Sequence, residues 1–204
     1  MSEIRKRLLA MHRAGHRRTV RGLRDEGHLA EREPRAAAVL IAVTERPQHE
    51  GHGPGVLMIE RPSRMRAHAG QVAFPGGAID PGETPVEAAL REAHEEIALP
   101  LSAVHVIGET DRYRTASGYA VTPVLATIPP DLPLNVNPAE VDEWFEAPLS
   151  FLLSRENQTE RSMFWQGRMR NFIEMHWEGH RIWGVTAAII ANLSHRLGWE
   201  ETWR

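Results

Sequence analysis

Three glutamates near the middle of the chain, Glu92, Glu95 and Glu96, are spaced so that they can act together. Residues three and four apart lie on one face of a helix, where like charges repel each other. Such a cluster is unfavourable unless a cation binds between the carboxylates. A hard divalent metal prefers oxygen ligands of this kind. The spacing therefore predicts a site for Mg²⁺ or Mn²⁺.

The residues before and around the glutamates predict the helix that must carry them. Thr84, Pro85 and Glu87 have the pattern of a capping box with proline at the first helical position. An apolar stripe follows at helical spacing and consists of Val86, Leu90, Ala93 and Ile97. We expect this stripe to face the core, and the three glutamates to flank it and point outward.

The helix and the loop before it resemble a known motif. The pattern G-x5-E-x7-R-E-x-x-E-E is matched by Gly77, Glu83, Arg91, Glu92, Glu95 and Glu96. This pattern is the Nudix box, and the resemblance implies a metal-dependent hydrolase that cuts diphosphate linkages. The box usually continues with a glycine where this chain has Ala98. Because glycine is favoured at a left-handed helix end, we expect Ala98 to cost some stability without affecting a ligand.

A second resemblance precedes the box. Residues 57–77 are similar to the motif L-L-T-x-R-[SA]-x3-R-x3-G-x3-F-P-G-G of coenzyme A pyrophosphatases. The matching positions are Leu57, Arg61, Arg66, Gly70, Phe74, Pro75, Gly76 and Gly77, whereas Met58, Ile59 and Pro62 depart from the motif. Residues 137–141 and 183–187 are also similar to this subfamily. The resemblance implies that the substrate is coenzyme A or an acyl-CoA.

The metal ligands can be ranked within the box. Glu92 and Glu96 are four residues apart on one helical row, so they are the first-choice ligands. Glu95 is the next, and the carbonyl oxygen of Gly76 or Gly77 would add a backbone ligand. Mg²⁺ combines a few carboxylates with water and substrate phosphate, which suits such an open site.

Other residues have supporting or substrate-binding roles. The resemblance implies that Glu83 and Arg91 form a structural salt bridge from the loop to the helix, with Gly77 as further support. Arg61 and Arg66 are the expected phosphate ligands, because a guanidinium group matches phosphate oxygens with two hydrogen bonds.

The general base is less sharply indicated. One of the helix glutamates would serve, or a carboxylate from a later loop. Glu140 is the best remote candidate because it belongs to the stretch 137–141, and Glu143 and Glu160 are alternatives. His68 would contact phosphate or transfer a proton, or it is a structural histidine.

Composition excludes several classes of protein. The formal net charge of -3 gives no electrostatic footprint for nucleic acid. The absence of cysteine excludes disulfides, thiolate catalysis and sulfur-bound zinc. No apolar run approaches about eighteen residues, so we expect no membrane partner and a cytoplasmic location. The N-terminal extension and the six tryptophans leave a homodimer open.

Two regions are expected. Residues 1–35 form a basic, helical N-terminal extension with ten Arg or Lys and five Asp or Glu, and residues 36–204 form the hydrolase domain. Strands are predicted at 36–43, 56–59, 71–74, 104–109, 119–128 and 141–147, with a hairpin from 164–165 and 173–177 and a last helix at 183–198. Together with the resemblance, this order predicts an α/β/α sandwich of the Nudix type with a mixed central sheet.

The most strongly indicated function is hydrolysis of the diphosphate of coenzyme A or acyl-CoA, which gives 3′,5′-ADP and 4′-phosphopantetheine or its acyl form. The same catalytic groups would also act on ADP-ribose, a dinucleotide or a nucleoside triphosphate. A non-catalytic ligand sensor is the remaining alternative, but a sensor has no need for all three glutamates of the box.

Overall fold

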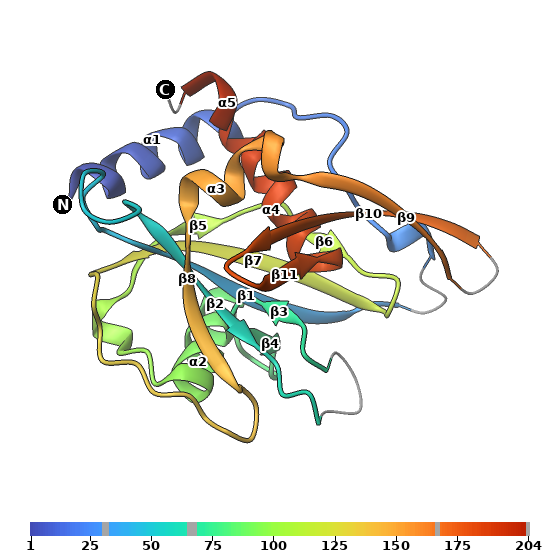
Figure 1. The fold of residues 1–204 in the computed structure, drawn as a ribbon, viewed down its shortest axis with the longest axis horizontal. Helices are drawn as coiled ribbons and strands as arrows, with labels where there is room; N and C mark the ends of the chain where they lie inside the picture. Colours follow the sequence, from blue (N-terminus) through green and yellow to red (C-terminus); the bar gives the residue numbers. More distant parts are fainter. Residues whose placement is uncertain (30–32, 65–68, 166–167, 203–204) are drawn as a thin grey trace.

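A computed structural model describes residues 1–29, 33–64, 69–165 and 168–202. Its helices are α1 (Glu3–His16), α2 (Pro85–Ile97), α3 (Leu149–Leu153), α4 (Gly184–Leu197) and α5 (Trp199–Thr202). The strands are β1 (Arg35–Thr44), β2 (Gly55–Glu60), β3 (Val72–Ala73), β4 (Gly76–Ala78), β5 (His105–Glu109), β6 (Tyr113–Arg114), β7 (Tyr119–Ile128), β8 (Glu143–Pro148), β9 (Thr159–Trp165), β10 (Arg168–Trp177) and β11 (His180–Trp183). Figure 1 shows their arrangement.

The main sheet is mixed, as predicted. Strands β1 and β7 run parallel along their whole length, from Arg35 opposite Tyr119 to Thr44 opposite Ile128. Strand β4 pairs antiparallel with β1, and β5 and β6 pair antiparallel with β7. Strand β2 pairs antiparallel with β1, β3 and β8. A second, three-stranded sheet has the order β11-β10-β9.

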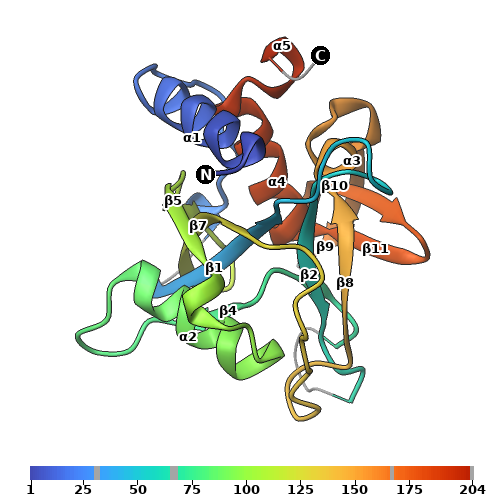
Figure 2. The same ribbon diagram turned by 90° about the vertical axis from the view of Figure 1, so that its left-hand side faces the viewer.

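Helices cover both faces of the main sheet, which completes the predicted α/β/α sandwich. In Figure 2, α2 lies on one side of β1 and β7, and α1 and α4 lie on the other. Alternate residues of β1 supply the two cores because successive side chains of a strand point to opposite faces. Ala38, Leu40 and Ala42 pack with α2. Ile41 and Val43 belong to the other core, with α1 and α4.

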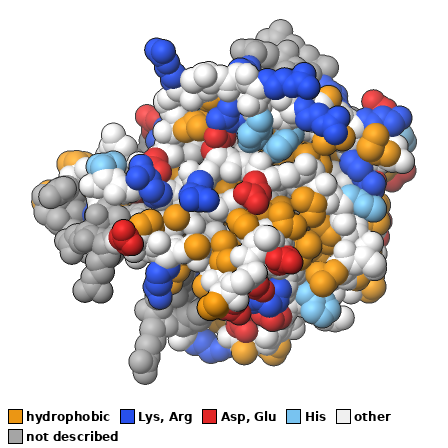
Figure 3. Space-filling model, turned by 180° about the vertical axis from the view of Figure 1, so that it is seen from behind, with side chains coloured by type: hydrophobic (Ala, Val, Ile, Leu, Met, Phe, Trp, Pro, Cys, Tyr) orange, Lys and Arg blue, Asp and Glu red, His pale blue; other side chains and the backbone are white. Residues whose placement is uncertain are grey.

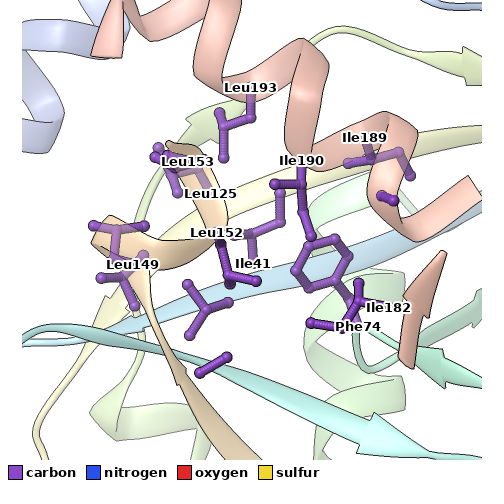
Figure 4. Packing of buried hydrophobic residues seen from close by; sticks show 14 of the residues in the cluster. Ile41, Phe74, Leu125, Leu149, Leu152, Leu153, Ile182, Ile189, Ile190 and Leu193 are labelled. Carbon is purple, nitrogen blue, oxygen red and sulfur yellow. The ribbon is translucent and has the colours of Figure 1, made fainter. Parts of the chain in front are cut away.

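The core on the α4 side is the larger one and joins both sheets. Leu125 of β7 lies there with Ile190 and Leu193 of α4, as Figure 4 shows. Ile182 of β11 and Leu149 of α3 also belong to this core. The second sheet is therefore packed onto the same hydrophobic cluster as the main sheet, which makes 168–197 part of the same folded unit.

The start of α2 is formed as predicted. The Thr84 hydroxyl accepts a hydrogen bond from the Glu87 amide at 3.2 Å, and the Glu87 carboxylate accepts one from the Thr84 amide at 2.8 Å. This capping box satisfies backbone donors that have no partner within the helix. The capping box therefore fixes the first residue of α2, and with it the positions of Glu92, Glu95 and Glu96 along the helix.

The expectation that all three helix glutamates point outward was wrong for Glu96. Its side chain is buried, with a relative exposure of 1%. The loop containing Asn137 covers this part of the helix, because the amide of Asn137 donates to the Glu96 carbonyl at 2.8 Å. A helical repeat shows which residues face the sheet, but it does not show which residues a distant loop covers.

The end of α2 is strained as expected at Ala98. This residue adopts the left-handed conformation, with φ 53° and ψ 33°. A side chain with a Cβ atom costs about 1 kcal/mol in that region, whereas glycine adopts it freely.

We expect Ala98→Gly to raise the free energy of unfolding by about 0.5–1 kcal/mol, because glycine removes this strain. Urea denaturation followed by circular dichroism measures the change, and activity should stay at the wild-type level. A loss of stability would show that the extra freedom of glycine in the unfolded chain outweighs the strain.

The N-terminal extension is helical over a shorter range than predicted. Helix α1 ends at His16, and residues 17–26 follow without regular structure before a single 3-10 turn at Gly27–Leu29. Ile4, Leu8 and Met11 are buried in the core beside α4. The first half of the extension is thus an integral part of the fold rather than a solvated arm.

Two further differences concern strands. The late hairpin is longer than predicted, since β9 and β10 span Thr159–Trp165 and Arg168–Trp177. The glycines after Phe74 are expected in the loop before the acidic helix, yet Gly76–Ala78 forms strand β4 against β1. On the face shown in Figure 3, acidic side chains lie among the basic ones. None of the described helices is long and apolar enough to cross a bilayer.

Candidate metal centre

Three carboxylates from two parts of the chain meet beside α2. One oxygen each of Glu92, Glu96 and Glu140 can be chosen so that all three atoms lie within 4.8 Å of one another. Glu92 and Glu96 lie on one row of α2, and Glu140 comes from the loop before β8. The structure thus brings together the two first-choice ligands and the residue predicted as a remote base.

Asn137 positions Glu140 over the helix. Its amide donates to the Glu96 carbonyl at 2.8 Å, and its carbonyl accepts hydrogen bonds from the amides of Glu140 and Val141. The Asn137 side chain also donates to Glu140 Oε1 at 3.3 Å. Val141 is fully buried and anchors the far end of this turn. Residues 137–141 therefore form a compact turn that holds one carboxylate against the end of α2.

Glu96 is the most strongly perturbed acid of the three. Its Oε2 accepts a hydrogen bond from the Gly76 amide at 2.9 Å, and Arg61 Nη2 lies 3.9 Å from its Oε1. Burial raises the pKa of Glu96 to about 7, and the charges of Glu92 and Glu140 add to this effect, while the Gly76 amide and Arg61 oppose it. The site is short of positive charge, which is the condition that a divalent cation would relieve.

This perturbation predicts a pH-dependent stability of the metal-free protein. Since the pKa of Glu96 rises from about 4.5 to about 7 on folding, the folded chain binds more protons than the unfolded chain between these values. Stability should therefore fall as the pH rises from 5 to 7.5, by about 2 kcal/mol from this residue. Denaturation in EDTA at both pH values, compared with Glu96→Gln, measures the effect; parallel profiles for the two proteins would contradict it.

Arg91 links the loop before the helix to the other acids. Its Nε lies 2.7 Å from Glu83 Oε1, which is the ion pair that the sequence predicted. Its Nη1 also donates to Glu92 at 2.9 Å and to Glu95 at 3.1 Å, and its Nη2 donates to the Ala78 carbonyl at 3.1 Å. Glu83, as the main cause, and Glu92 raise the pKa of Arg91 further above its ordinary value.

Glu95 does not share the position of the other helix acids. Its side chain is 50% exposed and is paired with Arg91, and it lies outside the group formed by Glu92, Glu96 and Glu140. The structure therefore favours Glu140 over Glu95 as the third carboxylate. The sequence spacing puts Glu95 and Glu96 on the same side of the helix, but it does not show which of the two side chains faces the loop that carries Glu140.

The glycines of β4 allow the close approach of backbone and carboxylate. A Cβ atom on Gly77 would lie 2.4 Å from Glu92 Oε1, and one on Gly76 would lie 2.4 Å from the Ala38 carbonyl oxygen. Both contacts are too short for any side chain. The Gly76 carbonyl accepts a long hydrogen bond of 3.5 Å from Arg61 Nη2. Gly76 is thus required by the backbone of β1, whereas a side chain at Gly77 would force the Glu92 carboxylate to move.

A cavity of about 490 Å³ adjoins the acids on the α4 side of the sheet. Arg61, Gly76 and Gly77 belong both to its wall and to the surroundings of Glu92 and Glu96. The rest of the wall is largely apolar and includes Val39, Phe74, Val121, Trp183 and Ile189. The Thr186 hydroxyl donates to the Val72 carbonyl at 3.0 Å and thereby joins the first turn of α4 to β3. A ligand in this cavity would therefore lie next to the carboxylates.

The remaining sequence candidates lie elsewhere or cannot be placed. Glu143 forms a separate group with Glu60 and His180, where His180 Nδ1 lies 3.2 Å from Glu60 Oε2. Glu160 pairs with Arg24 on the second sheet. Arg66 and His68 lie outside the described residues.

Sequence reasoning missed one contributor to the cavity wall. Glu26, from the irregular part of the N-terminal extension, lines the same cavity as Arg61. No spacing or motif pointed to it, because residues 17–29 have neither apolar periodicity nor a recognisable pattern. Its placement depends on long-range hydrogen bonds that only the folded chain contains.

The donor set of the three acids fits a hard cation. All three side chains offer carboxylate oxygens, and among the residues that the structure describes only Arg61 and Arg91 form ion pairs with Glu92 or Glu96. Glu92 and Glu96 would hold Mg²⁺ or Mn²⁺, since these ions prefer oxygen ligands, and the Glu140 carboxylate lies beside them.

Comparison with known proteins identifies the family. The model of the NUDIX domain matches residues 34–165. The relative named "Uncharacterized Nudix hydrolase NudL" from Escherichia coli O7:K1 (strain IAI39 / ExPEC) is 44% identical over 165 residues, which cover 80% of this chain and 83% of the relative. The relative of the same name from Shigella flexneri serotype 5b (strain 8401) is 44% identical over 171 residues, which cover 82% of this chain and 86% of the relative.

Among solved structures, the Nudix hydrolase RenU from M. Smegmatis has a TM-score of 0.49 at 27% identity and covers 58% of this chain and 73% of its own. An Ap4A hydrolase from C. elegans has a TM-score of 0.46 at 21% identity, and the match covers 56% of this chain and 80% of the hydrolase. The family model covers more than half of the sequence and includes the whole acidic helix, and on that evidence the chain belongs to the Nudix family of hydrolases.

Proposed function

We propose that this Nudix hydrolase cuts the diphosphate of coenzyme A or acyl-CoA. Three stretches that resemble coenzyme A pyrophosphatases are far apart in the sequence but meet at one site. The wall of the cavity includes Arg61 and residues 71–74, 76 and 77 from the first stretch and residues 183–186 from the last, and residues 137–141 bring Glu140 to the metal centre. This convergence supports the proposal, since the subfamily-like residues then surround one continuous region that a diphosphate substrate would occupy.

The reaction adds one water molecule across the phosphoric anhydride. The bridging P–O bond breaks, a new P–O bond forms to the water oxygen, and the products are 3′,5′-ADP and 4′-phosphopantetheine, or its acyl derivative. When bound, Mg²⁺ or Mn²⁺ would neutralise the diphosphate charge and lower the pKa of water. The protein must therefore hold the cation, orient the diphosphate and accept a proton.

Named residues supply these functions. Glu92 and Glu96 would hold the cation on the rigid helix. Glu140 lies beside them on a loop and would accept the proton of the attacking water. Arg61, which lies 3.9 Å from Glu96 and lines the cavity, would bind a phosphate oxygen of the substrate. Glu83 and Arg91 support this arrangement by fixing the loop to the helix.

A panel of substrates tests the proposal. With Mg²⁺ or Mn²⁺ present, kcat/KM for coenzyme A should exceed kcat/KM for ADP-ribose, diadenosine tetraphosphate and ATP by at least about tenfold, which corresponds to about 1.4 kcal/mol of transition-state binding. EDTA should abolish all turnover. A large preference for ADP-ribose or a dinucleotide would contradict the assignment of substrate, and absence of turnover with every member would favour a non-catalytic sensor.

A further inference from the structure

A short segment of the N-terminal extension, residues 24–27, is tied down at several points; we refer to it as the strap. Arg24 exchanges two backbone hydrogen bonds with the Asn192 side chain of α4, at 2.7 and 2.9 Å. The Asp25 carboxylate accepts from the amide and the Nε of Arg114, at 3.2 and 3.1 Å. The amide of Glu26 donates to the Arg114 carbonyl at 2.9 Å. The strap is therefore fixed between α4 and β6.

The Glu26 carboxylate is held at the cavity wall by only one of its oxygens. Oε2 accepts a hydrogen bond from the Ala116 amide at 3.1 Å. Oε1 accepts none from any residue that the structure describes. Among the described residues that line the cavity, Glu26 is the one anion and Arg61 is the one cation. The cavity thus has two ends with different electrostatic character.

The two charged residues lie far apart across the sheet. Arg61 contacts Gly76 of β4, and Glu26 contacts the chain just beyond β6. Strand β4 pairs with β1, β1 with β7, and β7 with β6, so three interstrand steps separate these strands. At about 4.8 Å for each step, the separation is about 14 Å. A ligand bound at the diphosphate site would need a long arm to reach Glu26.

The chemistry of the wall limits what that arm can be. Between the two ends the wall is uncharged and mostly apolar, with Val39, Val121 and Trp183 among its members, although it also includes polar side chains such as Thr115 and Ser117. A carboxylate at the far end repels phosphate and accepts hydrogen bonds from neutral amide or hydroxyl groups. An extended, uncharged chain with N–H and O–H donors fits this cavity, whereas a phosphorylated nucleoside does not.

We propose that the strap selects the orientation of the substrate: the pantetheine arm enters the cavity toward Glu26, and the 3′-phosphoadenosine end stays outside it. The free Oε1 of Glu26 accepts a hydrogen bond from the amide or hydroxyl donors of the arm. This proposal rests on the proposed function, because it assigns the two halves of coenzyme A to two sides of the same site.

Binding of the two product halves tests the orientation separately from turnover. Calorimetry in the presence of Mg²⁺ would measure Kd for 4′-phosphopantetheine and for 3′,5′-ADP, with wild type and with Glu26→Gln. The amide of glutamine keeps an acceptor for Ala116 but loses the charge. We expect Kd for 4′-phosphopantetheine to rise at least about tenfold, the lower end of what a hydrogen bond to a charged acceptor contributes. Kd for 3′,5′-ADP should change less than twofold.

Asp25→Asn provides the matched control. Asp25 belongs to the same strap but not to the wall of this cavity. Asp25→Asn removes a charge from the strap, whereas the contacts of Arg24 with Asn192 and of Glu26 with Arg114 and Ala116 remain, so both Kd values should stay within twofold of wild type. The proposal is overturned if 4′-phosphopantetheine binds Glu26→Gln as well as wild type, if it binds neither protein, or if Asp25→Asn weakens it equally. It is also overturned if Glu26→Gln tightens 3′,5′-ADP, since that would place the 3′-phosphate beside Glu26.

The outcome also separates this proposal from the proposed function. If wild type hydrolyses coenzyme A but Glu26→Gln binds both product halves with the same Kd as wild type, only the proposed orientation is refuted. Absence of hydrolysis by wild type in the substrate panel would refute the function, whatever the binding of the two halves shows.

Discussion

Glu96→Gln is expected to lower kcat for coenzyme A by about a thousandfold or more while leaving the fold intact. Glu96 is the buried member of the acidic group, and its carboxylate would bind the cation directly. A bound cation contributes several kcal/mol of transition-state stabilisation, and about 4 kcal/mol corresponds to a thousandfold change in rate. Steady-state kinetics at saturating Mg²⁺ measures the loss.

The fold should tolerate this change for a specific reason. The glutamine carbonyl oxygen would still accept the hydrogen bond that the Gly76 amide donates to Glu96 at 2.9 Å. Loss of a buried charge should stabilise the metal-free protein at pH 7.5 rather than destabilise it. Activity near the wild-type level would refute the role of Glu96 as a ligand, and a large fall in melting temperature would show that its role is structural instead.

Glu140→Gln should lower kcat strongly, whereas Glu95→Gln should lower it only slightly. We expect Glu140→Gln to lower kcat by about a hundredfold or more, since a positioned general base contributes about 10²–10⁴. Glu95→Gln should lower it by less than about fivefold, because Glu95 is half exposed and pairs with Arg91 outside the acidic group. Both variants remove one negative charge from the same region, so total charge cannot explain a difference between them.

The reverse order would contradict the arrangement of the site. If Glu95→Gln proved as damaging as Glu96→Gln while Glu140→Gln stayed active, the metal would have to lie on the exposed side of α2. Measuring Mg²⁺ affinity of the inactive variants by calorimetry separates a lost ligand from a lost base, because a lost base leaves metal binding intact.

Much of the helix and sheet could be predicted because the signals were local. The Thr84 and Glu87 capping box, the apolar stripe to Ile97 and the long apolar runs of β1 and β7 depend on residues close in the sequence. The resemblance to the Nudix box also depends on fixed spacing along one helix. Each of these features can be recognised from a short stretch of sequence.

The parts that could not be predicted depend on contacts between distant segments. Glu96 is buried because the turn at Asn137 lies on the helix end, and Gly76–Ala78 becomes a strand because β1 offers an edge to pair with. Glu26 reaches the cavity through hydrogen bonds to Arg114 and Ala116. Local propensity does not encode these contacts, so the sequence predicted the ligands on the helix better than their surroundings.

The central claim is that this chain splits the diphosphate of coenzyme A, and product identification in isotopically labelled water tests it most directly. Coenzyme A is incubated with the protein and Mg²⁺ in H₂¹⁸O, and the products are resolved by mass spectrometry. The account predicts 3′,5′-ADP and 4′-phosphopantetheine in equal amounts, with one ¹⁸O atom in one of the two, and no products in EDTA. Intact coenzyme A after prolonged incubation, or release of the 3′-phosphate with the diphosphate preserved, would contradict it.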